Sequence, residues 1–469
     1  MADCAPLWTS PEIEAATGGR LEGAAFACTG VSIDSRSVEP GDLFVALAGE
    51  RDGHDFIDGA LAKGAAGVLA SRPGPGSRIV AGDTLVALEA MGEAARLRAP
   101  EARRGAVTGS VGKTSLTQAI KLGLEMAGPA HGSVKSYNNH IGVPLTLARM
   151  PRGARRAIFE IGMNHADEIR PLARMVRPHA AAVSMVGPVH TENFPDGEAG
   201  VARAKAEIFA GIEPGGAAIL NADNRWFGLL NDEAAAAGAR VVTFGSAEDC
   251  DARLTGLRAI EGGAEVSARL HGRALSFPIR QTGAHWGLNS LAVLLMLEAL
   301  EVDLDTALAA LAAFAPLVGR GAERTVTTPA GAFVLIDDSY NANPVSLQAA
   351  LRTLGAHAAK GRRIAVLTDM LELGPDTERF HAQGADMVVE AGIDLVFCAG
   401  PLMKFLWDAL PPTRRGGYAQ NAAALGPQVV QAIEPGDVVM VKGSNGSKAS
   451  AVAAALAALD RAGTPGAHG

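Results

Sequence analysis

Short apolar runs alternate with helical segments in the last third of the chain. The runs at 333–337, 364–368, 395–398 and 438–441 are rich in Val, Ile and Leu and predict buried strands. Because helical segments separate them, they predict a doubly wound parallel sheet. Polar residues follow three of these strands. The carboxyl ends of parallel strands meet at one edge of a sheet, so we expect a ligand crevice there.

The middle of the chain has a related pattern. Apolar strands are predicted to end at Glu160 and near Val186, and a polar, sheet-like region follows from about 239 to 279. Apolar helices are expected from about 285 to 300 and from 305 to 314. These elements predict a second α/β unit.

Three domains are expected for a chain of 469 residues, which is too long for one hydrophobic core. The first hundred residues predict a small α/β unit, and a stretch with Pro100 and mixed charge is typical of a linker. The pattern changes again at Gly319. The predicted fold is therefore α/β, with domains at 1–100, 101–318 and 319–469.

The composition is that of a globular protein, with 48% hydrophobic and 20% charged residues. A net charge of −8 without a basic run argues against nucleic-acid binding. No window reaches about 18 consecutive apolar residues, so no transmembrane segment is expected. The four cysteines lack the spacing of a zinc site or a disulfide framework, and the start of the chain does not resemble a signal peptide. We therefore predict a cytoplasmic protein.

The segment Thr-Gly-Ser-Val-Gly-Lys-Thr-Ser at 108–115 predicts a phosphate-binding loop. Glycines let backbone N–H groups surround phosphate oxygens, and the following helix adds its positive end. Lys113 can reach the β- and γ-phosphates, and the Thr114 hydroxyl can bind Mg²⁺. The standard loop has a glycine where this chain has Val107, so the loop is a shorter form. The predicted nucleotide contacts are Gly109, Ser110, Val111, Gly112, Lys113, Thr114 and Ser115.

Two residues past strand ends are expected on the same edge as this loop, namely Glu160 and His190. Glutamate is a natural Mg²⁺ ligand, whereas histidine is less usual for so hard a cation. His190 is therefore either a metal ligand or a hydrogen-bonding loop residue.

Three further polar sites keep a structural alternative. The amides of Asn138 and Asn139 can hold a water or a phosphate, or can serve a turn. Ser35 and Arg36 offer donors to a phosphate or a uracil edge, or belong to a solvated loop. Lys205 lies on an amphipathic helix, where a lysine is ordinarily a surface charge.

With these segments together, the chain resembles the Mur ligase family from about residue 30 to 450. The motifs are Asp-Ser-Arg at 34–36, the phosphate loop, Asn-Asn at 138–139, Gly-Pro-Val-His at 187–190, Ala-Lys-Ala-Glu at 204–207, Asp-Asp-Ser-Tyr-Asn-Ala-Asn-Pro at 337–344 and Lys-Gly-Ser at 442–444. The short phosphate loop is the form that this family uses. The motif at 337–344 is most similar to family members that add D-alanyl-D-alanine.

The resemblance implies an N-terminal domain for the UDP end of a substrate, a central ATPase domain and a C-terminal Rossmann-like domain. It implies that Lys113 binds phosphates, that Thr114 holds one Mg²⁺ and that Glu160 and His190 hold a second. Lys205 is similar to the family's lysine that can be carbamylated, which would support Mg²⁺. Lys113, Glu160, His190 and Lys205 would be catalytic. ATP contacts would come from Asn289, Arg320, Asp338, Tyr340 and Asn341, and substrate contacts from Ser35, Arg36, Asn138 and Asn139.

The implied reaction is ATP-dependent amide formation between UDP-N-acetylmuramoyl-tripeptide and D-alanyl-D-alanine, by a monomer. Alternatives are a sibling ligase, a folylpolyglutamate-synthase-like ligase, or a phosphate-loop ATPase that makes no amide. The chain departs from the family pattern twice. Trp286 follows His285 where asparagine is usual, and His140 stands where an acidic residue is common.

Overall fold

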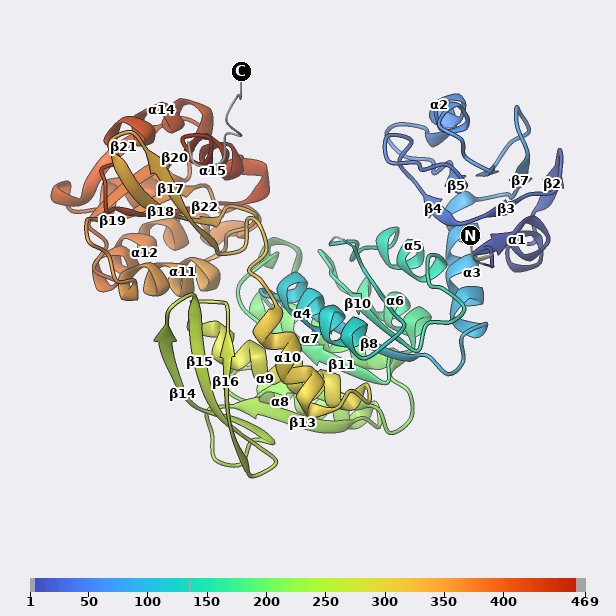
Figure 1. The fold of residues 1–469 in the computed structure, drawn as a ribbon, viewed down its shortest axis with the longest axis horizontal. Helices are drawn as coiled ribbons and strands as arrows, with labels where there is room; N and C mark the ends of the chain where they lie inside the picture. The colour runs from blue at the N-terminus through green and yellow to red at the C-terminus, as the bar shows by residue number, and fades with distance from the viewer. Residues whose placement is uncertain (1–4, 135, 461–469) are drawn as a thin grey trace, which may run out of the picture.

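The computed structural model describes residues 5–134 and 136–460, which form four β-sheets with helices packed on them (Figure 1). No helix in this part of the chain is long and apolar enough to cross a membrane. Cys28, Cys250 and Cys398 are free thiols, and Cys4 lies outside the described residues.

The N-terminal unit contains a five-stranded sheet in the order β2-β7-β6-β5-β4, with β2 antiparallel to its neighbour and the others parallel. Its strands are β2 (Arg20–Glu22), β4 (Gly30–Ser32), β5 (Asp42–Val45), β6 (Gly67–Ala70) and β7 (Arg78–Val80). A separate pair is formed by β1 (Trp8–Thr9) and β3 (Ala27–Cys28). The helices are α1 (Ser10–Thr17), α2 (Ile57–Ala62) and α3 (Thr84–Leu97).

The central unit contains a nine-stranded sheet in the order β16-β15-β14-β13-β12-β11-β8-β10-β9. It is parallel from β9 to β14 and ends in an antiparallel meander. The strands are β8 (Arg103–Thr108), β9 (Ala130–Gly132), β10 (Arg156–Glu160), β11 (Ala180–Val183), β12 (Ala217–Asn221), β13 (Arg240–Gly245), β14 (Ala252–Ile260), β15 (Gly263–Leu270) and β16 (Arg273–Ile279). The helices are α4 (Lys113–Met126), α5 (Gly142–Ala148), α6 (Ile169–Val176), α7 (Glu198–Ala206), α8 (Phe227–Ala236), α9 (His285–Ala299) and α10 (Leu304–Ala313).

The C-terminal unit contains a six-stranded sheet in the order β17-β18-β22-β19-β20-β21. Its strands are β17 (Ala322–Thr328), β18 (Gly331–Asp338), β19 (Arg363–Thr368), β20 (Leu395–Ala399), β21 (Arg415–Ala419) and β22 (Val438–Lys442). Helices α11 (Pro344–Ala356), α12 (Thr377–Glu390) and α13 (Met403–Ala409) share one apolar core with the sheet. Helices α14 (Ala422–Ala432) and α15 (Ala449–Ala457) share another. The sheet is therefore covered on both faces, as predicted.

The predicted α/β class with parallel sheets is confirmed, but a wholly parallel C-terminal sheet is wrong at one edge. Strand β17 pairs antiparallel with β18. Its sequence, Ala-Glu-Arg-Thr-Val-Thr-Thr, has no apolar run, and only Val326 of the strand is buried. An exposed edge strand therefore escaped a search for apolar segments. The domain limits at residues 100 and 318 remain a prediction.

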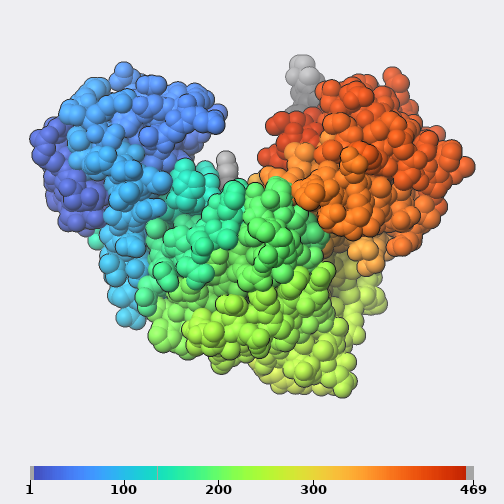
Figure 2. All heavy atoms as spheres, turned by 180° about the vertical axis from the view of Figure 1, so that it is seen from behind, coloured from blue at the N-terminus to red at the C-terminus, as the bar shows by residue number. Residues whose placement is uncertain are grey.

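The three units are joined in different ways (Figure 2). The N-terminal and central units share one hydrophobic core, in which Trp8, Leu88 and Met91 pack with Leu145 and Ala148 of α5. The Trp8 indole N–H also donates a hydrogen bond to the Ala148 carbonyl at 2.8 Å. None of the hydrophobic clusters of the described residues spans the central and C-terminal units. In Figure 2 the N-terminal and C-terminal units stand apart on either side of the central one.

The shared core predicts a specific loss of stability. Leu145 is fully buried, so Leu145→Ala should lower the unfolding free energy by about 2–5 kcal/mol through lost burial and a residual cavity. Thermal unfolding followed by circular dichroism measures the effect. Leu97→Ala is the control, because this side chain is 67% exposed and its loss should cost less than about 0.5 kcal/mol. Equal shifts for the two variants would contradict the prediction.

Candidate active site

The phosphate loop turns from β8 into α4 over residues 109–112. Gly109 has φ of 149° and Gly112 has φ of 81°, a region that favours glycine. A Cβ at Gly109 would also lie 2.0 Å from the Ser184 Oγ, so no larger side chain fits there. The two glycines let the backbone curl so that the Lys113 ammonium donates to the Gly109 carbonyl at 2.7 Å.

The segment after β11 holds this loop in place. The Ser110 N–H donates to the Met185 carbonyl at 2.6 Å, and the Ser110 hydroxyl donates to the Gly187 carbonyl at 3.1 Å. The Ser184 hydroxyl donates to the Val111 carbonyl at 2.6 Å. The loop is therefore preorganised by hydrogen bonds from a neighbouring strand end.

Glu160 lies beside the loop at the end of β10, and it is 1% exposed. The Thr114 hydroxyl donates to its Oε2 at 2.7 Å, and the Asn138 amide donates to its Oε1 at 2.7 Å. The Thr114 oxygen also lies 2.7 Å from the Ser136 Oγ. Both hydrogen-bond partners of this buried carboxylate are neutral, so its charge is not offset by direct contact. An oxygen-rich set of this kind fits Mg²⁺.

The two candidate lysines near the loop have altered basicity. Burial lowers the pKa of Lys113, and the Glu160 carboxylate opposes this effect. Lys205, on α7, is 1% exposed, and its side-chain ammonium makes no hydrogen bond or ion pair with any described residue. Burial, together with the nearby charge of Lys113, holds the pKa of Lys205 well below its usual value. A surface position for Lys205 is therefore excluded.

His190 does not join Glu160 in this arrangement. The Nδ1 atom of the His190 ring lies 3.0 Å from a carboxylate oxygen of Glu372. The backbone N–H of His190 donates a hydrogen bond to the Glu372 carbonyl at 3.0 Å. No hydrogen bond or ion pair within the described ranges connects His190 with Glu160. The same ranges hold no cluster of three or more His, Cys, Asp or Glu that could bind a metal. The metal role of His190 remains a prediction.

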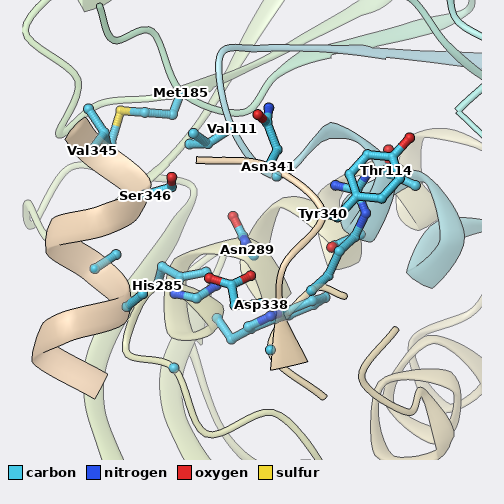
Figure 3. Close-up of a pocket in the computed structure, with 18 of the residues that line it drawn as sticks. Val111, Thr114, Met185, His285, Asn289, Asp338, Tyr340, Asn341, Val345 and Ser346 are labelled. Carbon is cyan, nitrogen blue, oxygen red and sulfur yellow. The ribbon is translucent and has the colours of Figure 1, made fainter. Parts of the chain in front are cut away.

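A pocket of about 530 Å³ lies between the loop and the C-terminal unit. Figure 3 shows Thr114 and Asn289 of the central unit facing Asp338, Tyr340 and Asn341 across it. The predicted nucleotide contacts that line the pocket are Ser110, Val111, Gly112, Lys113, Thr114, Ser115, Asn289, Arg320, Asp338, Tyr340 and Asn341. Sequence reasoning therefore selected residues that the fold brings together from two units.

Arg320 bridges the two sides of this pocket. Its guanidinium lies 4.1 Å from the centre of the Tyr340 ring, and it donates to the Ser136 Oγ at 3.3 Å. Gly319 accepts a hydrogen bond from the Tyr340 N–H at 3.0 Å. The segment that connects the units is thus part of the pocket wall.

Sequence reasoning gave no site role to several residues that line or adjoin the pocket. Lys442 forms an ion pair with Asp338, and Ser136 contacts Thr114 and Arg320. The position of Lys442 at a strand end could be predicted from the sequence. Its pairing with Asp338 could not, because the two residues are 104 positions apart. Trp286, the departure from the family pattern, packs against Phe314 with ring centres 5.6 Å apart and is 5% exposed. Trp286 therefore acts chiefly as a core residue.

The predicted substrate residues lie in two places. Asn138 contacts Glu160, whereas the Asn139 carboxamide oxygen accepts the N–H groups of Ile141 and Gly142 and so serves a turn. Arg36 lies in the N-terminal unit, outside the pocket, and pairs with Asp34 at 2.8 Å. Its guanidinium lowers the pKa of Asp34 to about 2. Ser35, beside Arg36, is half-buried.

The fold and the site together define a phosphate-loop enzyme built from three α/β units. Three family models match the chain: the Mur ligase family, catalytic domain, at 27–104; the Mur ligase middle domain at 107–297; and the Mur ligase, glutamate ligase domain at 323–445. A UDP-N-acetylmuramoyl-tripeptide--D-alanyl-D-alanine ligase of Rickettsia prowazekii is 30% identical, covering 94% of this chain and 98% of the relative. The protein of that name from Escherichia coli is 36% identical, covering 81% and 83%. The chain belongs to the Mur ligase family.

Solved structures agree with this assignment. A crystal structure of MurF from Acinetobacter baumannii has a TM-score of 0.85 at 26% identity, covering 96% of this chain and 99% of that one. MurF ligase from Thermotoga maritima in complex with ADP has a TM-score of 0.77 at 23% identity, covering 92% and 97%, and supports the fold alone. The predicted family and its three-domain fold are confirmed, and the chain is a ligase.

The loop geometry predicts the effect of removing its lysine. Lys113→Ala should reduce turnover by roughly 10²- to 10³-fold, because one preorganised cation near the phosphates is lost. Steady-state phosphate release measures this. Lys121→Ala is the matched control, since Lys121 lies on the same helix and pairs with Glu125 away from the loop. Similar activity of the two variants would contradict the assignment.

Proposed function

We propose that this protein joins D-alanyl-D-alanine to UDP-N-acetylmuramoyl-tripeptide at the expense of ATP. The observation that carries the proposal is the pocket in which the phosphate loop faces Asp338, Tyr340 and Asn341 of the C-terminal unit. Both relatives described above bear the name of this ligase. The Thermotoga maritima protein of the same fold was solved in complex with ADP.

The chemistry requires an activated carboxylate, since a free carboxylate is a poor electrophile. The γ-phosphoryl group passes to the tripeptide carboxylate, and ADP is released. The deprotonated amine of the dipeptide then attacks the acyl carbon, the bond to the phosphate oxygen breaks, and an amide and phosphate form. Lys113 offsets charge on the transferring group, and Arg320 lies at the pocket wall where the two units meet.

Magnesium fits the donor set beside the loop. Thr114 and Glu160 would hold one ion, and Glu160, His190 and Lys205 would hold or support a second. When bound, Mg²⁺ offsets phosphoryl charge and orients the reacting oxygens. The Glu372 carboxylate pairs with Nδ1 of His190, and Nε2 of the same ring would contact the ion.

A carbamate on Lys205 would change its role. A neutral amine attacks CO₂ and loses a proton, which converts the side chain to an anionic carbamate. The lowered pKa of Lys205 favours the neutral amine. Its side chain is buried without a hydrogen-bond partner among the described residues, so an anion there would pair with the nearby Lys113 charge.

Residues outside the phosphate loop have proposed roles in binding the substrate. Ser35 and Arg36 would serve the UDP end of the substrate, with Asn138 and Asn139 nearer the reacting end. The proposed domains are 1–100, 101–318 and 319–469. We also propose that the protein acts as a monomer in the cytoplasm, where ATP is supplied.

A coupled assay tests the function. With ATP, Mg²⁺, UDP-N-acetylmuramoyl-tripeptide and D-alanyl-D-alanine, phosphate should be released only when both substrates are present, because phosphate leaves when the dipeptide amine attacks the acyl phosphate that the tripeptide forms. Phosphate release that does not depend on the dipeptide would point instead to a phosphate-loop ATPase. Omission of Mg²⁺ or addition of a chelator should abolish the reaction.

Lys205→Ala tests the carbamate. The variant should be inactive and should regain activity with added short-chain carboxylic acids, which can restore the missing anion. Lys63→Ala, in the N-terminal unit, is a control that should not respond to the acids. Full activity of Lys205→Ala without rescue would remove the carbamate from the mechanism.

A further inference from the structure

Lys442 is a buried cation at the edge of the nucleotide pocket. It is the last residue of β22, which lies between β18 and β19 in the C-terminal sheet. Its side chain is 2% exposed. Burying an ammonium is costly unless a partner offsets its charge, so its contacts decide what it does.

The two side-chain hydrogen bonds of Lys442 reach the last residue of β18 and the turn that follows it. Its ammonium donates to Asp338 Oδ2 at 2.6 Å and to the Asn341 carbonyl at 3.1 Å. Asp338 and Lys442 are also register partners in the parallel pair of β18 and β22. One side chain therefore fixes both ends of the segment 338–341, which includes Tyr340.

The connecting segment holds the same turn from the other side. The Gly319 N–H donates to Asp337 Oδ2 at 3.2 Å, and the Tyr340 N–H donates to the Gly319 carbonyl at 3.0 Å. These bonds bring Tyr340 under Arg320. Arg320 packs on the Tyr340 ring, whereas Lys442 is a cation that donates hydrogen bonds to the turn itself.

That charge matters because of what the pocket would bind. The Asp338 carboxylate is 23% exposed and lines a pocket proposed for a polyanion. An unpaired carboxylate there would repel phosphates, and it would also let the turn relax. The Lys442 ammonium counters both effects.

We infer that Lys442 is a positioning residue for the nucleotide: it neutralises Asp338 and holds the 338–341 turn in its binding conformation. The inference rests on the proposed function, because it needs ATP in this pocket. It assigns Lys442 no contact with the reacting atoms.

Calorimetric titration of the full-length protein tests this, with ADP and a non-hydrolysable ATP analogue in the presence of Mg²⁺. Lys442→Met should weaken nucleotide binding by roughly tenfold or more, the effect of losing a charge-assisted hydrogen bond. Binding of UDP-N-acetylmuramoyl-tripeptide should stay within about twofold, since the shared core holds the N-terminal unit independently of this turn. Lys404→Met is the matched control, because Lys404 pairs with Asp408 on the exposed face of helix α13 in the same unit.

A double-mutant cycle separates positioning from direct contact. In the Asp338→Asn background, Lys442→Met should cost much less nucleotide affinity than in the wild-type protein. The same cost in both backgrounds would overturn the inference, as would an unchanged affinity of Lys442→Met. If Lys442→Met fails to fold, the double variant, which leaves no unpaired charge, is compared with Asp338→Asn alone: equal affinity supports the inference, and a further large loss overturns it. Failure of the wild-type protein to bind nucleotide would instead overturn the proposed function.

Discussion

The buried carboxylate of Glu160 is the constraint on which the site depends. Taking a carboxylate out of water is unfavourable, and its two hydrogen-bond donors, Thr114 and Asn138, are neutral. The nearby Lys113 offsets part of this charge, and a cation bound in the pocket would offset the rest. This need explains why residues from the loop, from β10 and from the segment at 136–138 meet at one point. The site is therefore arranged around a buried carboxylate whose hydrogen-bond partners are neutral.

Much of this site could be predicted from the sequence because its signals are local. The spacing of Gly109, Gly112 and Lys113 specifies a phosphate loop, and an apolar run ending in Glu160 places a carboxylate at a strand end. The Asn-Pro pair at 343–344 is a start signal for helix α11, and the helix begins there. The Asn343 side chain caps it by accepting the Ser346 N–H at 2.9 Å, and Pro344 is its first residue. Such features depend on a few neighbouring residues.

The remainder could not be predicted because it depends on contacts between distant segments. The partner of Lys442 lies over a hundred positions away, and the partner of His190 belongs to another unit. Strand β17 has no apolar run. It lies at the edge of its sheet, and only its Val326 is buried. The burial of Lys205 is likewise a property of how α7 packs, and its amphipathic sequence alone favoured the surface.

The single core shared by α3 and α5 has a consequence for substrate choice. Because Trp8, Leu88 and Met91 pack with Leu145, the N-terminal unit and the phosphate loop are held at a constant separation. Under the proposed function, a substrate anchored by its nucleotide end must span that separation to present its carboxylate to the loop. The first two units would then set the distance that the peptide part of the substrate has to span. Under the proposed function, they would favour a peptide long enough to cover that distance.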